Sequence, residues 1–142
     1  MSRHRQTIAV LAVVGIAIAT YLWLHAIGVI GVLKCGTGGC EIVQASSYAR
    51  LFGVPVAFYG VVEYALLLGI SVAGARPALA ARAWPTRWLA ALSGGGFLFT
   101  LYLTYLEVFV IHALCRWCLG SAVVITAIFA ASLAGLPSAR KA

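Results

Sequence analysis

The chain has 142 residues, of which 63% are hydrophobic and only 9% are charged. Its mean hydropathy is +1.04. Soluble domains normally carry about a quarter of charged residues, so this composition excludes a soluble globular domain and predicts an integral membrane protein. The net charge of +7 does not indicate nucleic-acid binding, because the basic residues stand singly at the ends of apolar runs and form no basic stripe.

Four apolar runs follow one another along the chain, at about Thr7–Leu33, Val54–Ala75, Trp88–His112 and Leu114–Leu136. Each run exceeds the roughly 20 residues that a helix needs to cross the hydrocarbon. Only helices and closed barrels satisfy all backbone groups in lipid. The sequence therefore predicts an all-α integral membrane protein, with residues 1–142 forming a single four-transmembrane-helix bundle.

The first run has the features of either a cleavable signal peptide or a retained helix. It follows Arg3 and Arg5 and contains a nominal cleavage site at Ala17-Ile18-Ala19. Because the apolar run continues well past that site, we expect the segment to be retained as a span.

The segment Lys34–Gly53 is the longest stretch that does not span. Its second half has spaced apolar residues, so it could form a short helix lying on the membrane. Pro55 would suit the first turn of the second spanning helix.

The basic residues predict how the bundle lies in the membrane. Seven of the ten flank the spans on one side, namely Arg3, Arg5, Arg76, Arg82, Arg87, Arg140 and Lys141. By the positive-inside rule, both termini are expected in the cytoplasm. All four cysteines then lie on the extracytoplasmic side, where disulfides form and persist.

The four cysteines form two pairs. Cys35 and Cys40 bracket a Gly-Thr-Gly-Gly loop, and Cys115 and Cys118 form a CxxC motif that opens the fourth run. Residues three apart share a helix face. The helix N-terminus and Arg116 both favour the thiolate, which is the nucleophile. This arrangement predicts two redox-active dithiols.

Other interpretations of the cysteines remain open. The CxxC and the wider pair together could hold a zinc ion, in a membrane protein without redox turnover. They could also be two inert structural disulfides, or unpaired small hydrophobic residues. An oxidising location favours disulfides, so we expect redox chemistry and no metal.

Two carboxylates lie inside the predicted spans, and intramembrane carboxylates are functional candidates by default. Glu107 is close in sequence to His112, and the two could relay protons; alternatively Glu107 snorkels to the interface. Glu63 is deeper, and its role stays open. The glycine run at residues 94–96 indicates close helix packing, with room for a ligand as the second interpretation.

Several segments resemble the vitamin K epoxide reductase family in its bacterial form. They are the pair Cys35 and Cys40, the run CEIVQASSYARLFGVPVAFYG from Cys40 to Gly60, and FVIHALCRWCLGSA from Phe109 to Ala122. The order of the pairs, with the CxxC second, is also that of the family.

The resemblance implies a four-helix bundle around a quinone pocket. Cys115 and Cys118 would be the active-site pair, with Cys118 facing the quinone. Cys40 would form the transient bridge with Cys115, and Cys35 would meet a thioredoxin-like partner. Ser46 matches a loop serine that assists at the pocket.

The resemblance also implies a reaction and a location. Ala122 occupies a position where animal members have a tyrosine, which favours ubiquinone or menaquinone over vitamin K epoxide. The expected enzyme is a quinone-dependent thiol-disulfide oxidoreductase of the bacterial inner membrane. Its expected partner is a separate periplasmic protein of the thioredoxin-like DsbA type, because this chain has no fused thioredoxin-like domain.

Overall fold

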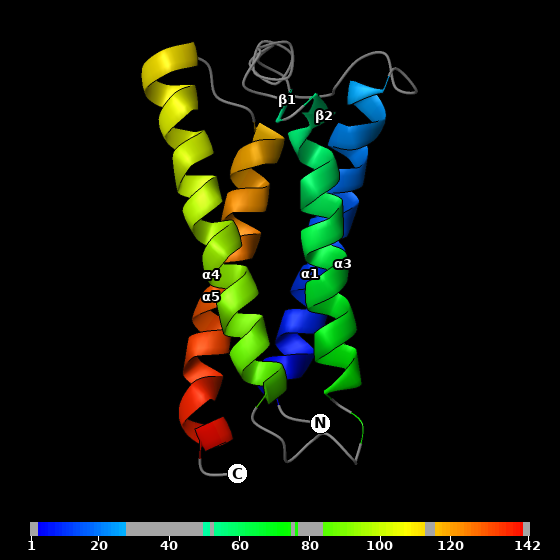
Figure 1. Ribbon diagram of the computed structural model, residues 1–142, viewed down its shortest axis with the longest axis vertical. Helices are drawn as coiled ribbons and strands as arrows, with labels where there is room; N and C mark the ends of the chain where they lie inside the picture. Colours follow the sequence, from blue (N-terminus) through cyan, green and yellow to red (C-terminus); the bar gives the residue numbers. More distant parts are fainter. Residues whose placement is uncertain are drawn as a thin grey trace.

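The structure of the protein is a computed structural model that describes residues 3–27, 50–51, 53–74, 76, 84–112 and 116–140. Its helices are α1 (Arg3–Ala26), α3 (Val56–Ala73), α4 (Trp84–Tyr105), the π-helix η2 (Leu106–Ile111) that continues α4, and α5 (Arg116–Arg140). The helices stand side by side as an elongated bundle (Figure 1). The prediction of a four-helix bundle is confirmed.

The order around the bundle is α3, α1, α5 and α4. α1 packs closely on α3 and on α5, and α4 packs closely on α5, whereas α3 and α4 make a looser contact. α1 begins and α5 ends at the same end of the bundle (Figure 1). The four helical stretches in the described part of the chain are all long and apolar enough to cross a membrane.

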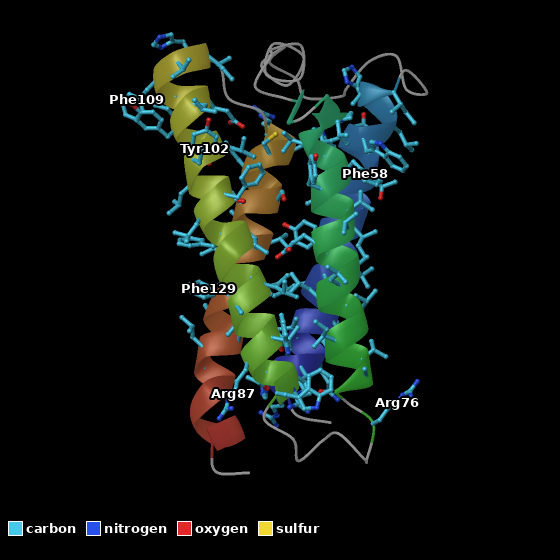
Figure 2. The ribbon with its side chains drawn as sticks, in the orientation of Figure 1. Phe58, Arg76, Arg87, Tyr102, Phe109 and Phe129 are labelled. Atoms are coloured by element: carbon cyan, nitrogen blue, oxygen red, sulfur yellow. The ribbon has the colours of Figure 1, made fainter. Side chains whose placement is uncertain are left out.

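The outer surface is apolar along its length. Val10, Leu98 and Val123 each expose about two thirds of their surface, at 66%, 66% and 69%. Tyr102 and Phe109 are exposed near one end of α4 and η2, far from Arg76 and Arg87 at the opposite end (Figure 2). Aromatic residues at this position are typical of the interface between hydrocarbon and headgroups.

The second helix begins later than predicted. Residues 54–55 form the strand β2 (Val54–Pro55), which pairs antiparallel with β1 (Arg50–Leu51). Gly53 lies in the turn between them with a φ of 78°, a conformation that glycine adopts without a steric penalty. Pro55 is the N-cap of α3, just before the helical turn in which it was expected. The short interfacial helix expected between residues 34 and 53 falls mainly outside the described residues.

The other boundaries also differ from the predicted ones. α1 begins at Arg3 rather than Thr7, and α4 begins at Trp84 rather than Trp88. Pro85 is buried in the first turn of α4, where its missing N–H is not needed. The predicted start of the last span, at Leu114, lies outside the described residues, in which α5 begins at Arg116.

A buried arginine holds α1 to the neighbouring helices at the end where the termini lie. Arg5 is only 2% exposed. Its guanidinium donates hydrogen bonds to the Gly74 carbonyl at the end of α3 and, over 3.2 Å, to Thr86 Oγ1 at the start of α4. His4 Nε2 lies 3.0 Å from the same hydroxyl. Because a buried charge needs such partners, this end of the bundle is fixed by polar contacts.

The core next to this end is close-packed. Ile8, Ala12, Leu67, Leu89 and Ile128 are each fully buried. Buried serines in the helices satisfy their hydroxyls by bonding to carbonyls in the preceding turn, for example Ser93 to Leu89 over 2.6 Å and Ser132 to Ile128 over 2.9 Å.

One close approach depends on a glycine. The ring of Tyr64 in α3 lies directly on Gly15 in α1, where a Cβ atom would overlap the ring carbons. The missing side chain lets α1 and α3 come together, as small residues do in membrane bundles.

Replacing Gly15 should therefore destabilise the bundle. Gly15→Ala forces the Tyr64 ring to move, and overpacking of this kind costs about 1–3 kcal/mol. We expect a lower midpoint of thermal unfolding in detergent. Gly69→Ala in α3 is the matched control, because no atom lies within 4 Å of the added methyl group. Equal midpoints for the two variants would contradict the packing described above.

Candidate functional site

A cavity of about 370 Å³ lies inside the bundle, in the half away from the chain termini. All four helices contribute to its wall. This volume lies within the roughly 300–1,000 Å³ of typical small-molecule sites. The lining is mainly apolar, and its polar side chains are Tyr59, Glu63, Tyr64, Thr100, Thr104, Glu107, Cys118 and Ser121.

α5 brings one cysteine into the wall. Cys118, Ser121 and Ile125 all line the cavity, and their spacing of three and four residues places them on one helix face. Cys118 is partly buried and packs with Leu22 of α1. Next to it, the rings of Trp117 and Tyr21 are 4.8 Å apart, so an aromatic contact holds the start of α5 against α1.

Tyr64 connects two walls of the cavity. It is 3% exposed, and its hydroxyl lies 2.8 Å from Ser121 Oγ and donates to the Ser121 carbonyl over 2.9 Å. This hydrogen bond crosses from α3 to α5 one helical turn from Cys118. No sequence motif predicted the pair, since the two residues lie 57 positions apart.

The π-helix places Glu107 in the cavity. Glu107 stands in its first turn, lines the cavity and is only 4% exposed. The segment ends at His112, whose backbone N–H donates to the Glu107 carbonyl and whose φ of 58° is left-handed. The His112 side chain is exposed and does not line the cavity. Of the predicted relay pair, one residue lies in the wall and the other at the surface.

Glu63 reaches the cavity from α3. Its Oε1 atom is buried and has no hydrogen-bond partner among the described residues. A Cβ atom at Gly96 would lie 3.0 Å from this oxygen and 3.3 Å from Ile125. Glu63 therefore occupies the space that a side chain at position 96 would need.

The two interpretations of the glycine run apply to different glycines. A Cβ atom at Gly94 would lie 3.1 Å from the Phe129 ring, so this glycine allows close packing of α4 on α5. Gly95 and Gly96 instead line the cavity and give it room.

The other predicted site residues have different outcomes. Ala122 is not among the lining residues, although Ser121 beside it is. Cys35, Cys40, Ser46 and Cys115 lie outside the described residues, so their pairing stays a prediction. The described residues contain no cluster of three metal-binding side chains, but the zinc alternative depends on those same cysteines and is not tested.

Comparison with known families assigns the chain. The model of the Vitamin K epoxide reductase family matches residues 6–133, which is most of the sequence. The chain belongs to this family. The resemblance seen in the cysteine-bearing segments is thereby confirmed, and so is a membrane helical bundle with an oxidoreductase role. The matched range includes both cysteine pairs, all of α3, α4 and η2, and most of α1 and α5.

The hydrogen bond between α3 and α5 should contribute to stability. Tyr64→Phe removes the hydroxyl and keeps the ring, and one lost hydrogen bond typically costs about 0.5–1.5 kcal/mol. We expect a lower thermal midpoint in detergent. Tyr102→Phe is the control, because Tyr102 is 55% exposed on the outer side of α4. If both variants lost the same stability, the Tyr64 bond would have no special role.

Proposed function

We propose that the protein is a membrane thiol:quinone oxidoreductase that supports disulfide-bond formation. It takes electrons from a periplasmic thioredoxin-like protein of the DsbA type through Cys35 and Cys40, and passes them through Cys115 and Cys118 to ubiquinone or menaquinone. The observation that carries this proposal is the position of Cys118 in the wall of a largely apolar cavity between membrane helices.

The cavity residues fit a quinone. A quinone ring is flat and apolar at its faces, and it carries hydrogen-bond acceptors only at its two carbonyl oxygens. The wall offers apolar side chains such as Phe99 and Leu103, with hydroxyl groups at Thr100, Thr104 and Ser121. When bound, the quinone would supply an acceptor for two electrons and two protons.

The cysteines have separate tasks. Cys118 is the residue that faces the acceptor, and Cys115 completes the disulfide once Cys118 has reacted. Two thiols become one disulfide, releasing two electrons and two protons. The direction of net transfer follows the reduction potentials of the two couples.

Four further residues are assigned by proposal. Ser46 assists at the quinone, and Ala122 lies beside the cavity face of α5. Glu107 and His112 form a proton relay, supported by the burial of Glu107 in the cavity wall and the exposure of His112 at the end of the same π-helix. Such a pair connects the cavity with the surface.

The orientation is also a proposal. Arg76 and Arg87 lie at the end of the bundle where both termini lie (Figure 2), and α1 begins at the same end with Arg3 and Arg5 (Figure 1). Cys118 lies in the first turn of α5, which begins towards the other end of the bundle. By the positive-inside rule, the first end faces the cytoplasm of a bacterial inner membrane and the cysteines face the periplasm.

The activity can be tested in a single anaerobic turnover. The purified protein is reduced with a dithiol, freed of reductant and mixed with a soluble quinone. We expect one quinol for every two thiols lost, measured by absorbance and by thiol counting. Cys118→Ser should form no quinol, because it removes the thiol in the cavity wall.

Ser132→Ala is the matched control. It removes a small hydroxyl from the same helix, bonded only to the Ile128 carbonyl and far from the cavity. It should form quinol as the wild type does. Unchanged thiols and no quinol in the wild type would contradict the proposal, and stoichiometric bound zinc would then support the metal-binding alternative.

A further inference from the structure

Glu63 presents a carboxyl group to the cavity that the steps above do not use. Its Oε1 atom is buried and has no hydrogen-bond partner among the described residues. Buried polar atoms without partners are uncommon and costly, and each one needs an explanation. Because Glu63 lines the cavity, an occupant of the cavity can supply the missing hydrogen bond.

Glu63 and Cys118 lie at different depths along the bundle. A Cβ at Gly96 would contact both Glu63 Oε1 and Ile125, so the carboxyl group lies near the level of Ile125. Ile125 follows Cys118 by seven residues, or about 10 Å at the helical rise of 1.5 Å per residue. The cavity thus has a thiol towards one end and a carboxyl group towards the other.

We propose that Glu63 binds the quinone oxygen that lies farther from Cys118 and passes a proton to it during reduction. This inference rests on the proposed function, because it takes a quinone as the occupant. It adds a role for a residue of this chain in recognising and protonating the buried end of the acceptor ring.

The two thiols, Glu63 and the acceptor account for every proton and electron of the reaction. Oxidation of the two thiols sends two electrons to the acceptor and releases two protons. The O–H bond of Glu63 breaks as the new O–H bond forms on the ring oxygen. The carboxylate left on Glu63 then takes up one of the released protons, and the other acceptor oxygen receives the second.

Other titratable groups face the same cavity and must be distinguished from Glu63. They are Tyr59 and Tyr64 of α3, Glu107 of η2 and Cys118 of α5. Among the described residues, α1 contributes only Ala19 and Leu22 to the lining, and neither titrates. The Tyr64 hydroxyl is engaged with Ser121. Cys118 is replaced by serine in the test below. Glu107 is the other carboxyl group among the described lining residues, so the effect of Glu63 has to be compared with that of Glu107.

Quinone binding without turnover provides the test. In a Cys118→Ser background, the affinity for a tail-less ubiquinone analogue is measured by quenching of tryptophan fluorescence across a pH series. A protonated Glu63 donates to the quinone carbonyl, and the ionised form cannot. We expect affinity to fall about tenfold as pH rises, the value of one hydrogen bond to a buried group.

Glu63→Gln should remove this pH dependence, because an amide donates at every pH, and Glu63→Asp should keep it. Glu107→Gln should also keep it. An infrared difference spectrum should show the protonated carboxyl band shift on binding in the Cys118→Ser protein and lose that shift in Glu63→Gln. Thermal midpoints confirm that each variant is folded.

The outcomes separate the two proposals. If the protein bound no quinone at any pH, the proposed function would be wrong. If quinone bound with a pH dependence that survived in Glu63→Gln, or that vanished in Glu107→Gln instead, the role of Glu63 would be wrong while the proposed function stood.

Discussion

The contact of Tyr64 with two other helices is the interaction on which the site depends. Its ring lies on Gly15 of α1, and its hydroxyl bonds to Ser121 of α5. Three helices are thereby held at one level, and the fourth, α4, meets α3 only loosely. On the side of the termini the core is filled by fully buried residues such as Leu67 and Ile128. On the other side the helices leave a cavity. Tyr64 thus lies where the close-packed core meets the cavity, and it belongs to both.

Each half of the bundle buries polar side-chain atoms, those of Arg5 in one half and Glu63 Oε1 in the other. At the end with the termini, two nitrogen atoms of the buried Arg5 donate hydrogen bonds to the Gly74 carbonyl and to Thr86 Oγ1. In the cavity, Glu63 Oε1 lacks a partner among the described residues. Since the hydrocarbon offers no hydrogen bonds, a polar occupant of the cavity or a water molecule can complete the hydrogen bonding of the carboxyl group.

The sequence predicted the four spans because apolar length alone identifies them. It did not predict their boundaries, because these depend on contacts between distant segments. Arg5, assigned by its charge to a flank, lies inside α1, where its guanidinium donates to Gly74 and Thr86. The π-helix at Leu106–Ile111 also escaped prediction, since an apolar run does not reveal a change in hydrogen-bond register. Glu107 lies in the first turn of this π-helix. Cys118 was named from its motif, whereas Tyr64 and Ser121 meet only in the fold.

The cavity weakens packing between the helices, and this bears on the residues that line it. Missing contacts in a void weaken packing. Gly95 and Gly96, in the middle of α4, line the cavity and carry no side chain to fill it. α4 also packs less closely on α3 than on α5. Glu63 fills part of the space opposite Gly96 with a polar group. The half of the bundle with Arg5 is filled by buried side chains. The half with Cys118 holds the cavity, where the oxygen atoms of a ligand can contact both the Cys118 thiol and the Glu63 carboxyl group.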